Sequence, residues 1–151
     1  MNTLMAYRGK FVPKNIDKYD GNPYDITYRS LWERGAFRYL DMNPDVVKWG
    51  SETIVVPYRC GTDGRMHRYF PDLKVTFKTG VTLLVEIKPA SQVNPPKVNK
   101  NSRKRRRYIK EVLTWKKNDS KWKAANEFAQ DRGWVFDIWT EKTLRSMGIK
   151  V

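Results

Sequence analysis

The fold is decided by two neighbouring stretches of the sequence, RYFPDLKV at residues 68–75 and LLVEIKP at residues 83–89. Each is a run of apolar, β-branched and aromatic residues interrupted by charge, which is typical of a strand. The segment 78–80 between them, Lys-Thr-Gly, supplies a glycine where a tight turn needs a positive φ. The two stretches are therefore predicted to pair as an antiparallel hairpin.

Three charged side chains are predicted to meet on this hairpin. Successive side chains leave a strand on opposite faces, so Glu86 and Lys88 share one face while Ile87 points into the core. If the hairpin places Asp72 beside Glu86, two carboxylates and one ammonium group converge. The carboxylates would repel each other and shift toward neutrality unless a cation lay between them. A hard divalent ion such as Mg²⁺, which prefers oxygen ligands and also binds substrate phosphate, satisfies this need.

This arrangement indicates phosphodiester hydrolysis. Lys88 would orient or activate the attacking water, or stabilise charge on the phosphate. The alternative is a structural ion pair between adjacent strands, which is a common use of opposite charges at paired positions.

Outside the hairpin, the pattern predicts one α/β domain with a mixed sheet. Helices are expected from a cap at Thr27 to the stop at Asn43-Pro44, from the basic run at 103–107 through an apolar stripe ending at Trp115, from a cap at Ser120 to Gly133, and at 141–147. Strands are expected at 46–49, 53–58, 67–77 and 81–87, as an antiparallel meander, and at 134–139. Residues 90–101 are predicted to form a loop.

The chain length of 151 residues favours a single domain, and no internal repeat is found. Residues 1–25 are predicted to form an extended basic arm, and residues 26–151 the domain. The chain lacks an apolar run long enough to span a bilayer and lacks the apolar core of a signal peptide, so an intracellular protein is expected. Cys60 is the one cysteine, which argues against a disulfide or a cysteine-based metal site and predicts oxygen ligands for any metal.

The charge predicts a polyanionic partner. Lys and Arg number 30 against 16 Asp and Glu, a formal net charge of +14. Nucleic acid is the favoured partner, and an anionic membrane surface is the lesser alternative because no long helix with an all-apolar face is found. Five cations in a row open the basic helix, where the helix dipole disfavours them unless anions compensate. DNA binding is therefore predicted for Arg103, Lys104, Arg105, Arg106 and Arg107, the alternative being a solvated helix start.

The motifs of the hairpin resemble a known nuclease signature. Pro71-Asp72 followed by Glu86-Ile87-Lys88 is similar to the core motif of the PD-(D/E)xK nuclease superfamily. With the helix segment YRSLWE at 28–33, the two strands look like those of the TnsA-type endonucleases. The whole chain, including WGSE at 49–52 and WKAA at 122–125, resembles the head completion proteins of T4-like tailed phages.

This resemblance implies a restriction-endonuclease-like fold, a mixed sheet flanked by helices. It also implies roles for particular residues: Asp72, Glu86 and the carbonyl of Ile87 would bind the metal, Lys88 would be the catalytic lysine, and Glu33 would complete the acidic cluster. Mg²⁺ would be the cofactor, with Mn²⁺ able to substitute.

The resemblance further implies a DNA endonuclease that acts on double-stranded DNA in phage head completion, trimming or processing packaged DNA ends. Portal, neck or other head proteins are the implied partners. The implied location is the host-cell cytoplasm during assembly, with retention in the virion head as a further expectation. Two alternatives remain open: a non-catalytic DNA-binding head-closure protein, and a basic nucleic-acid chaperone or packaging protein without chemistry.

Three further residues are weighed on their own patterns. Glu33 is at helical spacing from Phe37 and therefore at the edge of a buried stripe, although an ordinary surface pairing with Arg29 or Arg34 also explains it. Glu52 is expected to follow a turn at residues 50–51. His67 is expected to be a strand residue or a phosphate contact, in preference to a metal ligand.

Overall fold

A computed structural model of the protein describes residues 7–98 and 102–151, and the side chains from residue 105 onward in the second range. Its centre is a four-stranded sheet in the order β3-β6-β7-β8. The strands are β3 (Val46–Ser51), β6 (Leu73–Phe77), β7 (Thr82–Ile87) and β8 (Val135–Trp139). β3, β6 and β7 pair antiparallel, whereas β8 is parallel to β7. The mixed sheet predicted from the sequence is confirmed.

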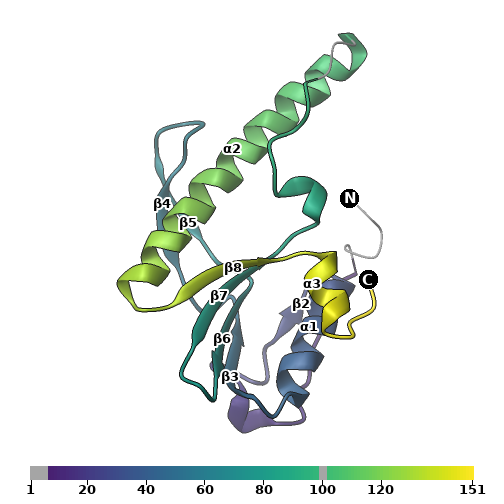
Figure 1. The fold of residues 1–151 in the computed structure, drawn as a ribbon, viewed down its shortest axis with the longest axis vertical. Helices are drawn as coiled ribbons and strands as arrows, with labels where there is room; N and C mark the ends of the chain where they lie inside the picture. The colour runs from purple at the N-terminus through teal and green to yellow at the C-terminus, as the bar shows by residue number, and fades with distance from the viewer. Residues whose placement is uncertain (1–6, 99–101) are drawn as a thin grey trace.

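Helices cover both faces of this sheet (Figure 1). On one face, α1 (Leu31–Met42) and α3 (Glu141–Ser146) pack over a core centred on Phe37 and Trp49. On the other face lie α2 (Ser102–Asp131) and a separate two-stranded sheet of β4 (Val56–Arg59) and β5 (Met66–Tyr69). The smaller elements are β1 (Gly9–Lys10), β2 (Thr27–Tyr28) and the 3₁₀ helices η2 (Ile16–Lys18) and η3 (Ala90–Gln92).

The first helix begins three residues later than predicted. Thr27 is in β2, paired with Lys10, and Ser30 is the N-cap. The Ser30 hydroxyl accepts a hydrogen bond of 3.1 Å from the backbone N–H of Glu33. Residues 30–33 have the Ser-x-x-Glu sequence of a capping box, and the helix therefore starts at Ser30 and not at Thr27.

The predicted antiparallel meander is wrong, because the run 67–77 forms two strands and not one. Pro71 has no N–H to donate to a ladder, and the chain leaves β5 at Tyr69 and enters β6 at Leu73. β5 then pairs with β4 in its own sheet, and β3 pairs directly with β6. As a consequence, Asp72 lies at the bend that leads into the central sheet.

The two helices predicted at 103–115 and 120–133 are one helix, α2. No Gly or Pro interrupts residues 102–131, and Ser120 does not cap a helix start. Its hydroxyl instead donates to the carbonyl of Lys116 at 3.0 Å and accepts from the N–H of Gly61 at 3.0 Å. The apolar stripe predicted to be buried is also wrong in part, since Ile109 and Leu113 are 53% and 50% exposed. Figure 1 shows this half of α2 extending beyond the sheet.

Residues 7–25 follow a largely extended course along the domain. β1 pairs with β2, the ring of Phe11 packs edge-on against Phe37, and the buried Tyr19 packs against Trp49. The division into an arm at 1–25 and a domain at 26–151 stays a prediction, and its residues 1–6 lie outside the described residues. In the described part of the chain, no helix is both long enough and apolar enough to cross a membrane.

Candidate active site

The β6–β7 hairpin brings Asp72, Glu86 and Lys88 together. Leu73 pairs with Val85, so the next position along each strand sets Asp72 opposite Glu86. The Lys88 ammonium lies 3.9 Å from Glu86 Oε1, and Ile87 between them is buried in the core on the α1 side. Asp72 Oδ2 accepts a hydrogen bond of 2.7 Å from the N–H of Ile87. The two carboxyl groups are therefore held next to each other at the end of the paired strands.

The nearby positive charge does not offset the burial of the carboxyl groups in this cluster. Burial raises the pKa of Asp72 well above its ordinary value, and the negative charges of Glu86 and Glu33 raise it further. Burial also raises the pKa of Glu86, although a hydrogen bond from Tyr69 and the charge of Lys88 act in the opposite direction. Closely spaced carboxylate oxygens that the fold does not neutralise are the ligands that a hard divalent cation prefers. The donor set therefore fits such an ion.

Glu33 lies on α1, and its charge acts on the same cluster. It is 8% exposed, and its Oε2 accepts a hydrogen bond of 2.7 Å from the backbone N–H of Arg29. Burial raises the pKa of Glu33, against this hydrogen bond. Glu33 therefore does bind Arg29, as the alternative of an ordinary surface pairing predicted, but it binds the backbone N–H of Arg29. The negative charge of Glu33 contributes to the raised pKa of Asp72, so Glu33 acts on the acidic pair electrostatically.

Two residues that the sequence reasoning missed complete the surroundings of Glu86. The Tyr69 hydroxyl donates to Glu86 Oε2 at 2.6 Å, and burial and the charge of Glu86 raise the tyrosine pKa, which keeps the proton on the phenol. Lys121 of α2 places its ammonium 5.6 Å from the centre of the Tyr69 ring. Burial lowers the pKa of Lys121, and the charge of Glu86 opposes this. Tyr69 was visible in the deciding motif, whereas nothing in the α2 sequence marks Lys121.

A basic cleft of about 380 Å³ adjoins the acidic cluster. It is lined by Arg29, Glu52, Arg68, Tyr69, Phe70 and Lys121. Arg29 pairs with Glu52 at 2.6 Å. The turn predicted at residues 50–51 is wrong, because both residues are in β3 and Glu52 directly follows that strand. Glu52 has a positive φ of 54°, and its N–H donates to the carbonyl of Asp72 at 3.1 Å. A non-glycine residue in this conformation is strained, and the strain is located where the backbone borders the site.

A larger cavity of about 1020 Å³ lies between α1 and the C-terminal segment. Its lining includes Leu31, Tyr39 and Ile149, but neither Tyr69 nor Lys121, the neighbours of Glu86 that line the smaller cleft. The chemistry of the side chains therefore directs attention to the smaller cleft.

The predicted DNA-binding run opens α2, at the end that extends from the sheet (Figure 1). Arg105, Arg106 and Arg107 are exposed, and Arg107 pairs with Glu111 one turn further on at 3.1 Å. The side chains of Arg103 and Lys104 lie outside the described residues.

A different cluster bears on the prediction that the one cysteine argues against a cysteine-based metal site. Cys60, Asp63 and His67 each offer a ligand atom, and these atoms lie within 4.8 Å of one another. Counting cysteines missed the cluster because its other two members are not cysteines. His67 is in β5, as predicted for a strand residue, and its ring also belongs to this cluster.

Comparisons with known proteins agree with these observations. A model of the family described as "TnsA-like endonuclease N terminal" matches residues 43–141, a range that contains Asp72, Glu86 and Lys88 but not Glu33. The chain is 46% identical over 148 residues to a protein of Enterobacteria phage T4 named "Head completion nuclease", covering 97% of this chain and 99% of that protein. No solved structure matches the chain.

Proposed function

Because the chain belongs to the TnsA-like endonuclease family, we propose that it is a nuclease that hydrolyses phosphodiester bonds of double-stranded DNA in phage head completion. The observation that carries the proposal is the pair Asp72 and Glu86, two adjoining carboxyl groups with raised pKa values and a lysine beside them. A purely structural ion pair does not need the second carboxylate.

Asp72, Glu86 and the carbonyl of Ile87 would hold the divalent ion, with Glu33 close by. Mg²⁺ is the proposed ion, with Mn²⁺ able to substitute, because all of these ligands are oxygens. When bound, the ion would lower the pKa of water and neutralise charge on the scissile phosphate. Tyr69 would keep Glu86 oriented through the hydrogen bond that it donates.

Lys88 is the proposed catalytic lysine. Its ammonium lies 3.9 Å from Glu86 Oε1, and it would orient the attacking water or stabilise the charge that develops on the phosphate. Lys121 adds a second cation whose charge acts on the same carboxylate, from α2. We assign it to the phosphate on the other side of the reacting bond.

DNA would lie along α2. An α-helix rises about 1.5 Å per residue, so Arg106 is about 22 Å from Lys121 along the helix axis. At about 3.4 Å per base pair, this separation corresponds to roughly six base pairs. The exposed arginines at the start of α2, together with Arg103 and Lys104, would therefore contact phosphates well away from the bond that is cut.

In the biological setting, the nuclease would trim or process packaged DNA ends while heads are completed in the host-cell cytoplasm. Contact with portal, neck or other head proteins, and retention in the virion head, belong to the same proposal.

The test is DNA cleavage by the purified protein. Linear and circular double-stranded DNA are incubated with Mg²⁺ or Mn²⁺ and the wild type, Asp72→Asn or Lys88→Ala. Asp131→Asn and Lys142→Ala change the same residue types at exposed positions and serve as matched controls. Cleavage by the wild type and both controls, but not by the site variants, supports the proposal. Equal activity in all five proteins, or none in any, would show that the assignment is wrong.

Complementation separates catalysis from a purely structural role in the head. A phage lacking the protein is supplied with the wild type or with Asp72→Asn. Rescue by the wild type alone supports a catalytic role in head completion. Equal rescue by the variant would favour the non-catalytic head-closure function.

A further inference from the structure

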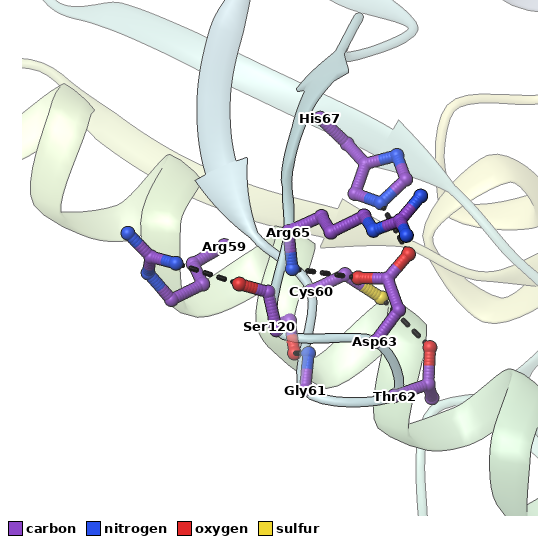
Figure 2. Close-up of polar contacts among 9 residues, drawn as sticks. Arg59, Cys60, Gly61, Thr62, Asp63, Arg65, His67 and Ser120 are labelled. Atoms are coloured by element: carbon purple, nitrogen blue, oxygen red, sulfur yellow. Dashed lines mark hydrogen bonds and ion pairs between the residues drawn. The ribbon is translucent and has the colours of Figure 1, made fainter.

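The loop between β4 and β5 holds a cluster of side chains that the nuclease site does not use. Figure 2 shows Cys60, Asp63 and His67 facing one another across this loop. The cysteine sulfur, a carboxylate oxygen and a ring nitrogen lie within 4.8 Å of one another. In the described part of the chain, it is the one group of three His, Cys, Asp or Glu side chains whose ligand atoms all lie this close together.

The backbone of the loop fixes the cluster. The N–H of Cys60 donates to the carbonyl of Arg65 at 2.9 Å, and the N–H of Gly64 donates to the carbonyl of Cys60 at 2.8 Å. Gly64 has a positive φ of 69°, which a glycine adopts without strain and which closes the turn. Residues 60 and 67 are thereby folded back onto each other at the end of the hairpin.

The side chains are also oriented before any ligand arrives. Asp63 Oδ1 accepts a hydrogen bond of 2.8 Å from the N–H of Arg65, which leaves Oδ2 to face the His67 ring at 2.7 Å. The His67 ring stacks on Tyr58, with ring centres 5.7 Å apart. A hydrogen-bonded carboxylate and a ring held by packing are the features that orient the ligands of metal sites.

The thiol of Cys60 is prepared for the same role. Its residue is 2% exposed, and its sulfur lies 3.0 Å from the Thr62 hydroxyl (Figure 2). The thiolate is the form that binds metals. Asp63 and His67 have side chains 41% and 38% exposed, so they form the open side of the cluster.

We propose that Cys60, Asp63 and His67 bind Zn²⁺ or a chemically similar late divalent transition-metal ion, at a site separate from the acidic cluster. Sulfur, imidazole nitrogen and carboxylate oxygen together select such an ion over Mg²⁺. Tetrahedral ligands at about 2.0–2.3 Å from zinc lie roughly 3.5 Å apart, so small side-chain rotations convert the observed cluster into a site. Water would take the fourth position on the exposed side.

The ion would position elements of the nuclease site without taking part in its chemistry. The loop is tied to α2 by the hydrogen bond from Gly61 to Ser120, the residue next to Lys121 (Figure 2). At the other end of β5, Tyr69 donates to Glu86. An ion that holds the loop in place would therefore fix the positions of Lys121 and Tyr69, which both line the basic cleft. This role rests on the proposed function, whereas metal binding itself does not.

The experiment uses the full chain, freed of metal with a chelator and titrated with Co²⁺ and then Zn²⁺. Co²⁺ reports a bound thiolate by an intense charge-transfer absorption in the near ultraviolet. The wild type and Asp72→Asn are expected to show this band with one Co²⁺ per chain, and Zn²⁺ is expected to displace it. Cys60→Ser should lose the band, while Asp63→Asn, which keeps an acceptor for the N–H of Arg65, should retain it with weaker binding.

Calorimetry gives the size of the effect. Loss of even an indirect partner of a ligand costs about 10–100-fold in metal affinity, so Cys60→Ser should weaken Zn²⁺ binding by about 100-fold or more. Zn²⁺ should also raise the melting temperature of the wild type but not that of Cys60→Ser, while circular dichroism confirms that the variant is folded.

The proposal would be overturned by absence of a thiolate band in the wild type, or by equal Zn²⁺ affinity in the wild type and Cys60→Ser. Loss of binding in Asp72→Asn would assign the ion to the acidic cluster instead. None of these measurements requires cleavage of DNA. A failure of the nuclease proposal would therefore leave the metal result standing, and the reverse also holds.

Discussion

The acidic cluster and the outer half of α2, residues 105–116, differ in almost every physical respect. The cluster is set into the end of the sheet, and its carboxyl groups come from α1, β7 and the bend before β6. The outer half of α2 is one exposed helical segment that carries positive charge away from the sheet (Figure 1). Catalysis requires groups held in a fixed geometry, whereas phosphate attraction requires only charge within reach. We therefore expect cleavage and DNA affinity to be separable by mutation.

The largest effect is expected for Lys88→Ala. Removing one group that stabilises developing charge typically costs about 10²–10³-fold in rate, so single-turnover cleavage at saturating DNA should fall by that factor. The dissociation constant for DNA should change little, because the outer half of α2 is intact. Gel-shift titration in Ca²⁺ measures the affinity without cleavage. A loss of DNA affinity as large as the loss of cleavage rate would show that mutation does not separate the two.

Lys121→Ala tests the boundary between the two regions, because Lys121 is on α2 but faces Glu86 and Tyr69. If it contacts the reacting phosphate, its removal should lower the single-turnover rate by roughly 10–100-fold. Lys123→Ala, two residues along the same helix, removes an exposed lysine that pairs with Asp119 and should leave the rate unchanged. A similar decrease in both variants would mean that Lys121 acts only through the general charge of α2.

Replacing Arg105, Arg106 and Arg107 with Ala should act in the opposite way. Each phosphate contact contributes a slope of about 0.9 to the dependence of log affinity on log salt, so three lost contacts should reduce the slope by at most about 2.7. The cleavage rate at saturating DNA should stay the same. The charge-matched control replaces three exposed cations around α3, Lys142, Arg145 and Lys150. An equal decrease in slope for both triple variants would remove the outer half of α2 from the DNA contact.

The parts of the site that the sequence predicted are those set by local backbone geometry. Strand alternation places Glu86 and Lys88 on one face whatever surrounds them, and the hairpin sets Asp72 opposite Glu86. Lys121 depends on how α2 packs across the sheet, which no local pattern encodes. The Cys60 cluster is intermediate: a cysteine, a glycine-containing turn and a histidine at hairpin spacing are visible in the sequence, but only as a combination.

The fold follows the same division. The existence of each strand in the central sheet was predictable from its composition, whereas the pairing of β3 with β6 was not, because it depends on β4 and β5 leaving the sheet. The helix start moved from Thr27 to Ser30 because two candidate caps were available and the pairing of Thr27 with Lys10 removed one of them. The course of α2 shows the converse, since Ser120 has the residue type of a cap but finds its partners inside a continuous helix.

The smallest expected effect concerns stability and has the opposite sign to the effect on activity. The pKa of Asp72 is raised in the folded protein, so ionised Asp72 destabilises the metal-free fold above the pH at which an unfolded aspartate titrates, about 4. Asp72→Asn keeps an acceptor for the N–H of Ile87 and removes that charge. At pH 7 in a chelator it should therefore be more stable by about 1 kcal/mol, equivalent to a melting temperature about 2–4 °C higher.

Acidification and metal should each remove this gain. Below pH 4 the wild-type carboxyl group is protonated in both states, so the difference should vanish. At neutral pH, Mg²⁺ should stabilise the wild type in preference to the variant, because it binds the folded site. The exposed Asp131→Asn and the α2 triple-arginine variant should show neither change. If Asp72→Asn were no more stable than Asp131→Asn in chelator at pH 7, ionised Asp72 would not destabilise the metal-free fold. The acidic cluster and the exposed half of α2 would then not differ in the way that their electrostatics predict.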